Sequence, residues 1–143
     1  MAEPRTIRRV AFQVLFQMDI TGEADAQSLV GPVADERELT GSERDRACAL
    51  ASGAYAGRAA ADAAVAELAP EWPPHRQPAV DRNVLRLAFH EMTAGITPPK
   101  VAVSEAVKLA KEFSTEKSPA FVNAILDKLL KKLPAPTATE PDA

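Results

Sequence analysis

The stretch Ser114–Leu130, "STEKSPAFVNAILDKLL", combines a helix start with a strict apolar repeat. Ser118 and Pro119 form the start signal, because a serine hydroxyl can cap free backbone N–H groups and proline needs no N–H partner in the first turn. The apolar residues beyond them recur at helical spacing: Val122, Ile125, Leu126, Leu129 and Leu133. Phe121 lies about 100° around the helix from the first residue of this stripe, and Lys117 lies just before it. The core does not account for an aromatic ring at that position.

Helical periodicity extends through the rest of the chain, and we find no strand pattern. Further helices are expected within residues 5–20, 24–36, 40–69, 80–93 and 98–114. The alanine-rich part of 40–69 should form one long helix that ends near residue 69. The inward residues expected in the helix within 80–93 are Val84, Leu85, Leu87, Ala88 and Met92. Residues 70–78, "PEWPPHRQP", cannot continue a helix and should connect two subdomains. The expected fold is therefore all-α, with about seven helices and no sheet. It forms one domain over residues 1–133, divided into subdomains 1–69 and 79–133 and followed by a disordered tail, 134–143.

The composition limits the partners that the chain can have. It has 143 residues and a formal net charge of −3, so an anionic partner must be met by a local patch of cations. Such patches occur in "EPRTIRR" (3–9) and from "KLAKEFSTEK" to "DKLLKK" (108–132). Neither a membrane span nor a signal peptide is predicted, and the expected location is the cytoplasm. The single cysteine, Cys48, excludes an internal disulfide and any multi-cysteine metal site.

The sequence gives little support for catalysis. His75 and His90 are the only histidines, and nucleophile-elbow, Walker, dinucleotide-binding and HExxH patterns are absent. Glu105 and Glu112 share a helix with interleaved lysines, which indicates a solvated ion-pair face. We therefore predict no enzymatic activity, no catalytic residue, no metal site and no cofactor.

Residues outside the apolar stripe of the first helix suit nucleic-acid binding. Four of them project within a narrow sector: Arg5, Arg9, Phe12 and Phe16. Arg8 lies at the border of this sector. Arginine neutralises phosphate, and an exposed aromatic ring stacks on an unpaired base with about 1–3 kcal/mol, a combination that favours single-stranded RNA over duplex DNA. The alternative is that these cations are ordinary surface residues and that Phe121 packs under a neighbouring loop.

Three motifs follow one another along the chain: "RRVAFQVLFQMD" (8–19), "DRNVLRLAFHEM" (81–92) and "VAVSEAVKLAKEFSTEKSPAFVNAILDKL" (101–129). Together they resemble the signature of the bacterial antitermination factor family NusB, whose fold consists of two packed helical subdomains. The resemblance implies that the chain binds the boxA segment of nascent RNA together with NusE, a small-subunit ribosomal protein. It also implies assembly with RNA polymerase, NusA and NusG to suppress premature termination, notably in ribosomal RNA operons.

The same resemblance implies the site residues. The arginine-rich first helix of the family corresponds to Arg5, Arg8 and Arg9, and its RNA-contacting aromatic residue corresponds to Phe121. Lys117 stands where the family usually has Asp, which adds a cation beside the expected RNA surface and strengthens phosphate attraction. Two further departures are Ser104 in place of Asn and His90 in place of Tyr. Asp81 matches an acidic position that resembles part of the NusE-facing surface.

Two other functions remain open at this stage. The same helical domain occurs at the front of ribosomal RNA cytosine methyltransferases, and one alternative is a stand-alone relative of that domain. The chain itself ends in "PAPTATEPDA" with no methyltransferase domain. The other alternative is a homodimeric helical scaffold without a nucleic-acid role. For the antitermination factor, a homodimer is an alternative form in the absence of NusE.

Overall fold

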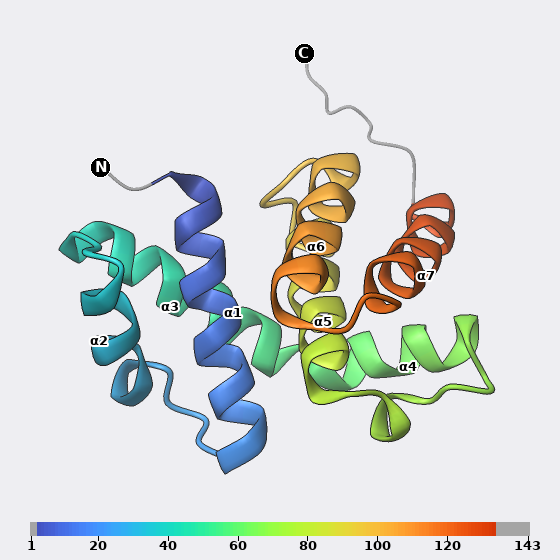
Figure 1. Cartoon of the computed structure of the whole chain (residues 1–143), viewed down its shortest axis with the longest axis horizontal. Coiled ribbons are helices and arrows are strands. Elements are labelled where there is room, and N and C mark those ends of the chain that lie inside the picture. Colours follow the sequence, from blue (N-terminus) through green and yellow to red (C-terminus); the bar gives the residue numbers. More distant parts are fainter. Residues whose placement is uncertain (1–2, 134–143) are drawn as a thin grey trace.

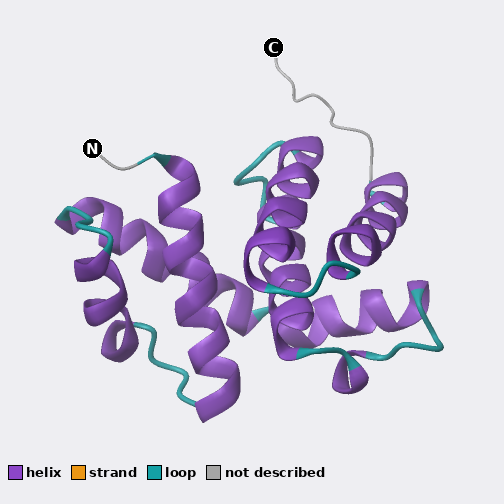
Figure 2. Ribbon diagram, in the orientation of Figure 1, coloured by secondary structure: helices purple, strands orange, loops and turns teal. Residues whose placement is uncertain are grey.

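The computed structural model describes residues 3–133, and over this range it contains seven α-helices, one short 3₁₀ turn and no strand (Figures 1 and 2). The helices are α1 (Pro4–Thr21), α2 (Gln27–Glu36), α3 (Gly41–Ala56), α4 (Arg58–Leu68), α5 (Ala79–Thr93), α6 (Pro99–Phe113) and α7 (Ser118–Lys132). The prediction of an all-α fold is confirmed. The expected disordered tail, 134–143, lies outside the described residues.

The helices form two groups that meet at the middle of the molecule. In Figure 1, α1, α2 and α3 lie together at the left, whereas α4, α5, α6 and α7 lie at the right. α5 joins the groups, because it packs against α1 and α3 on one side and against α4, α6 and α7 on the other. α4 belongs by its contacts to the second group, whereas the expected first subdomain extended to residue 69.

The alanine-rich segment is two helices, so the prediction of a single helix ending near residue 69 is wrong. The helix is interrupted at Gly57. Glycine lowers helix stability by about 1 kcal/mol relative to alanine. Arg58 reinforces the break, because its guanidinium donates to the carbonyl oxygen of Tyr55 at 2.7 Å and stacks over the Tyr55 ring at 3.8 Å. This turn directs α4 onto α5 and α7.

The core follows the predicted stripes in the C-terminal helices. In α7, Val122, Ile125, Leu126 and Leu129 are buried, whereas Leu133, the last residue of the predicted stripe, follows the helix and is only partly buried. The inward residues expected on α5 are buried as well: Val84, Leu85, Leu87, Ala88 and Met92. In α1 the outcome differs for Phe12, which is 2% exposed and packs its ring 5.1 Å from the Phe113 ring. The buried face of α1 is thus wider than the predicted stripe.

α3 and α5 approach each other closely at a glycine. A Cβ atom built on Gly53 would lie 2.3 Å from Nε2 of His90, so a side chain at this position would displace the imidazole. Burial against α3 lowers the pKa of His90, because the charged imidazolium loses hydration there. His90 is therefore a packing residue of the interface between the two helix groups.

Over residues 3–133, none of the helices combines the length and the apolar character that crossing a lipid bilayer requires.

Candidate nucleic-acid interface

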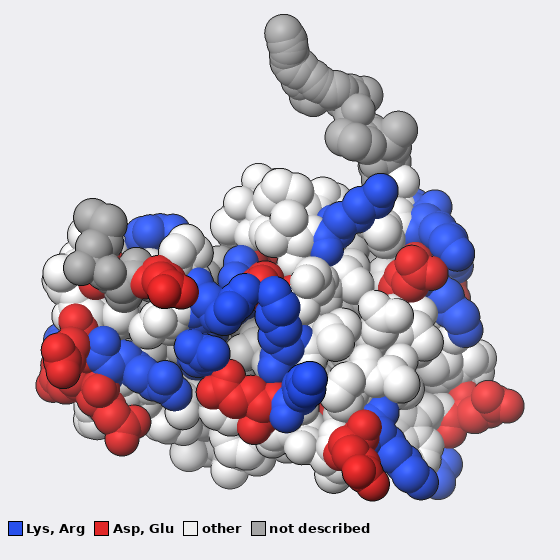
Figure 3. Space-filling model, turned by 45° about the horizontal axis from the view of Figure 1, so that its top comes forward, with Lys and Arg blue, Asp and Glu red and all other residues white. Residues whose placement is uncertain are grey.

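Cations from α1 and α6 gather on one face of the molecule. Figure 3 shows Lys and Arg side chains across the middle of this face, with Asp and Glu beside them. The residues that meet between the two helices are Arg5, Arg8, Arg9, Glu105, Lys108, Leu109 and Glu112. Three of these cations reach solvent, namely Arg5, Arg9 and Lys108, and we call them the α1–α6 band.

Each cation of the α1–α6 band is held by a carboxylate of α6. Arg5 donates from Nε and Nη2 to the two oxygens of Glu105 at 3.0 and 3.2 Å, and Lys108 donates to Glu105 at 3.2 Å. Arg9 donates to Glu112 at 2.7 Å. The hydrogen bond from Arg5 lowers the pKa of Glu105, and it outweighs the opposing effect of burial. The predicted solvated ion-pair face fits exposed Glu112 but is wrong for buried Glu105.

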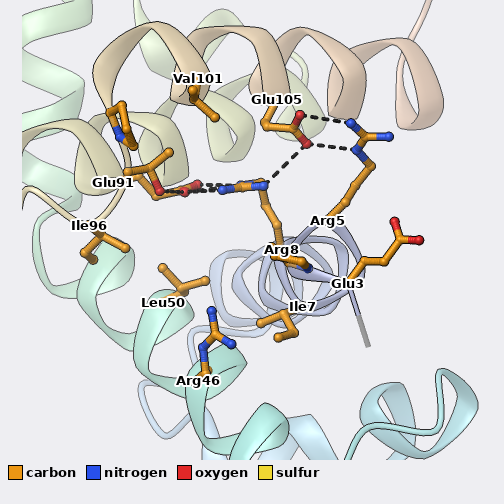
Figure 4. Close-up of a pocket in the computed structure, with 13 residues that line it drawn as sticks. Glu3, Arg5, Ile7, Arg8, Arg46, Leu50, Glu91, Ile96, Val101 and Glu105 are labelled. Carbon is orange, nitrogen blue, oxygen red and sulfur yellow. Dashed lines mark hydrogen bonds and ion pairs between the residues drawn. The ribbon is translucent and has the colours of Figure 1, made fainter. Parts of the chain in front are cut away.

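Arg8 is directed into the protein. Its guanidinium donates from Nη2 and Nε to the two oxygens of Glu91 at 2.7 and 3.0 Å, and from Nη1 to Glu105 at 3.4 Å (Figure 4). Glu91 also accepts the Thr97 hydroxyl at 2.6 Å. Arg8 is 9% exposed and Glu91 is 2% exposed. This buried ion pair connects α1 to α5 and occupies most of the hydrogen-bonding capacity of the Arg8 guanidinium.

The start of α7 presents the other two predicted RNA-binding residues. Lys117 is exposed, and we find no ion pair for it within residues 3–133. Phe121 is partly buried and packs against the edge of the core, one turn into the helix. Part of its ring therefore remains at the surface, in the neighbourhood of an unpaired cation.

Asp81 is buried and binds two hydroxyl groups at the start of α7. It accepts the hydroxyl of Ser114 at 2.8 Å and the hydroxyl of Ser118 at 3.0 Å, and it is 3% exposed. The predicted cap is therefore wrong: Ser118 bonds to Asp81, and Lys117 takes the N-cap position without a side-chain cap. Sequence reasoning did not find this contact, because the two partners lie 37 residues apart.

An apolar concavity of about 290 Å³ lies between α1, the start of α5 and the end of α6. Its walls are Phe12, Gln13, Phe16, Gln17, Val80 and Phe113. The Oε1 atom of Gln13 is buried and has no hydrogen-bond partner among the described residues. The concavity thus offers mainly aromatic and aliphatic surface.

Over residues 3–133 the protein has seven helices in two groups, with an arginine-bearing first helix paired to α6 and an apolar concavity beside it. These features define a small all-helical binding protein. The model of the NusB family matches residues 5–131. The chain therefore belongs to the NusB family.

Relatives and solved structures agree with this assignment. The transcription antitermination protein NusB of Rubrobacter xylanophilus is 41% identical over 134 residues, which cover 90% of this chain and 94% of the relative. The T. maritima NusB structure superposes with a TM-score of 0.82 at 31% identity, covering 92% of this chain and 94% of that one. Because the relatives are antitermination proteins, the prediction that the chain is not an enzyme is confirmed.

One similar structure contains partners. It holds the antitermination factors NusB and NusE in complex with double-stranded RNA. Its NusB-like chain superposes with a TM-score of 0.79 at 26% identity, covering 90% of this chain and 96% of that chain.

Proposed function

We propose that the chain is a transcription antitermination factor that binds boxA RNA together with NusE. It then joins RNA polymerase, NusA and NusG, acts in the cytoplasm, and serves ribosomal RNA operons above all. The observation that carries the proposal is the α1–α6 band, a cluster of solvent-reaching cations on a protein of net charge −3, in a member of the NusB family. The similar structure that contains NusE and RNA supports both partners.

In this proposal the predicted RNA-binding residues have different roles. Arg5 and Arg9 bind phosphates from the α1–α6 band, and Lys117 binds a phosphate at the start of α7. Their exposure favours this role, because a phosphate can compete with a carboxylate for an arginine that solvent already reaches. Arg8 acts as a positioning residue, since its pairing with buried Glu91 fixes α1 against α5.

Phe121 supplies the base contact in this proposal. The exposed part of its ring stacks on an unpaired base, and the remainder anchors the ring on the core. Its partial burial limits the movement of the ring, so little side-chain entropy is lost when a base binds.

NusE is proposed to dock on the apolar concavity rather than on the Asp81 carboxylate itself. Asp81 is buried beneath the start of α7, whereas its neighbour Val80 lines the concavity with Phe16 and Phe113. Asp81 then supports the NusE-facing surface by holding Ser114 and Ser118 in place. When NusE is absent, the same apolar surface favours a homodimer.

Two variants of Phe121 test the RNA proposal. Phe121→Leu keeps apolar contact with the core but lacks a flat ring, so boxA affinity should fall by about 1–3 kcal/mol while the melting temperature changes little. Phe121→Tyr keeps the ring and should bind as the parent does. Both affinities are measured by fluorescence anisotropy in the presence of NusE. Parent-like boxA affinity of a folded Phe121→Leu variant would exclude stacking at this position.

A further inference from the structure

A second basic surface lies on the side of α6 that faces α7. Here an open groove of about 440 Å³ lies between the two helices. Its lining residues are Lys100, Val103, Ser104, Val107, Lys108, Lys111 and Asn123. We call it the α6–α7 groove. Val103 and Val107 form its floor, while its three ammonium groups, the Ser104 hydroxyl and the Asn123 amide are all on exposed residues.

The charge of the α6–α7 groove is unlike that of the whole chain. Three lysines line it and no Asp or Glu does, whereas the chain as a whole has a net charge of −3. Within residues 3–133 we find no ion pair for Lys100 or Lys111, and Lys108 alone is paired, with Glu105 at 3.2 Å. Two unpaired cations therefore line one concave surface, which favours an anionic ligand.

The groove continues from the α1–α6 band. Lys108 lines both surfaces, so cations follow one another from α1 across α6 towards α7. Lys111 lies eleven positions after Lys100 in α6, which separates the two residues by about 16 Å along the helix axis. A row of this length is longer than the spacing of neighbouring phosphates in a nucleic-acid strand, so it can face more than one of them.

We propose that the α6–α7 groove binds the phosphates of single-stranded RNA that flanks the boxA element. This inference rests on the proposed function and extends it, because it assigns a path for RNA beyond the recognised segment. The Ser104 hydroxyl and the Asn123 amide would donate to phosphate oxygens between the ammonium groups. The floor of two valines offers no hydrogen-bonding groups to base edges, so the groove would bind RNA without reading its sequence.

The test uses Lys100→Gln/Lys111→Gln, since these two lysines line the groove and not the α1–α6 band. The control is Lys128→Gln/Lys131→Gln, which removes two exposed lysines of α7 that line neither surface. Three RNAs are titrated against the full chain with NusE over a range of salt concentrations. They are boxA alone, boxA with a short uridine extension on each side, and a uridine RNA of the extended length.

The extension should raise the affinity of the parent and steepen its salt dependence. Lys100→Gln/Lys111→Gln should reduce the slope for extended RNA by about 1.4, since each single-strand contact contributes about 0.7. Its affinity for boxA alone should stay at the parent value. The control variant should resemble the parent with every RNA.

Three other outcomes would contradict the proposal that the α6–α7 groove binds flanking RNA. They are an extension that adds no affinity to the parent, an equal loss in both double variants, or a loss of NusE affinity in Lys100→Gln/Lys111→Gln without RNA. The last would identify a protein contact. If boxA itself is not bound, the proposed function fails separately. The uridine RNA then tests the α6–α7 groove independently of boxA. It should bind Lys100→Gln/Lys111→Gln several-fold more weakly than it binds the control variant. Equal binding to the two variants would refute the inference.

Discussion

Replacing Arg8 by Met should destabilise the protein without removing an RNA contact. Met retains an unbranched apolar side chain but leaves the Glu91 carboxylate, which is 2% exposed, with the Thr97 hydroxyl as its remaining side-chain donor. Removing one partner of a buried ion pair costs about 3–5 kcal/mol. Because domains of this kind have total stabilities of about 5–15 kcal/mol, the loss is large but measurable on a folded protein.

Urea unfolding followed by circular dichroism gives the free energy of unfolding of each variant. The matched control is Arg46→Met. Arg46 is an exposed arginine of α3 that lines, with Arg8, the pocket drawn in Figure 4, and its replacement should change stability by no more than about 0.5 kcal/mol. Arg8→Met/Glu91→Leu removes both charges and should recover much of the loss. An Arg8→Met variant within about 1 kcal/mol of the parent would refute the role of this pair.

Two further predictions concern charge. Arg5→Gln/Arg9→Gln should flatten the slope of log boxA affinity against log salt by about 1.4, and an unchanged slope in a folded variant would remove the α1–α6 band from the phosphates. The lowered pKa of His90 means that the unfolded chain binds this proton more readily than the folded chain, so stability should decline as the pH falls from about 6.5 towards the lowered pKa. Unfolding curves of the parent and of His90→Gln over this pH range measure it, and an identical pH dependence of the two proteins would contradict the assignment.

The apolar stripes were predictable because a helix with one buried face carries apolar residues at a regular spacing, and this spacing is visible in the sequence. The inward faces of α5 and α7 illustrate this, since each predicted residue on α5 is buried. The break at Gly57 was not predictable in the same way. Alanine on either side of Gly57 favours a continuous helix, and one glycine lowers helix stability by only about 1 kcal/mol. The interruption of the helix therefore also depends on the contact between Arg58 and Tyr55.

The partners of the site residues depend on tertiary structure that local sequence does not encode. Arg8 and Glu91 lie 83 residues apart, and nothing in either segment distinguishes Arg8 from its neighbours Arg5 and Arg9 except its position at the border of the stripe. That border position is the signal that could have indicated burial. Ser118 likewise has the sequence context of a helix cap, but Lys117 occupies the N-cap position, and Ser118 lies inside the first turn, where its hydroxyl donates to buried Asp81.

The central claim is that RNA and NusE bind this chain together, and a titration of labelled boxA RNA with and without saturating NusE tests it most directly. The chain alone should bind weakly because of its net negative charge, and NusE should raise its boxA affinity. By linkage, boxA RNA should raise the affinity for NusE by the same factor. Equal boxA affinity in the presence and absence of NusE, at one salt concentration, would contradict the proposed function.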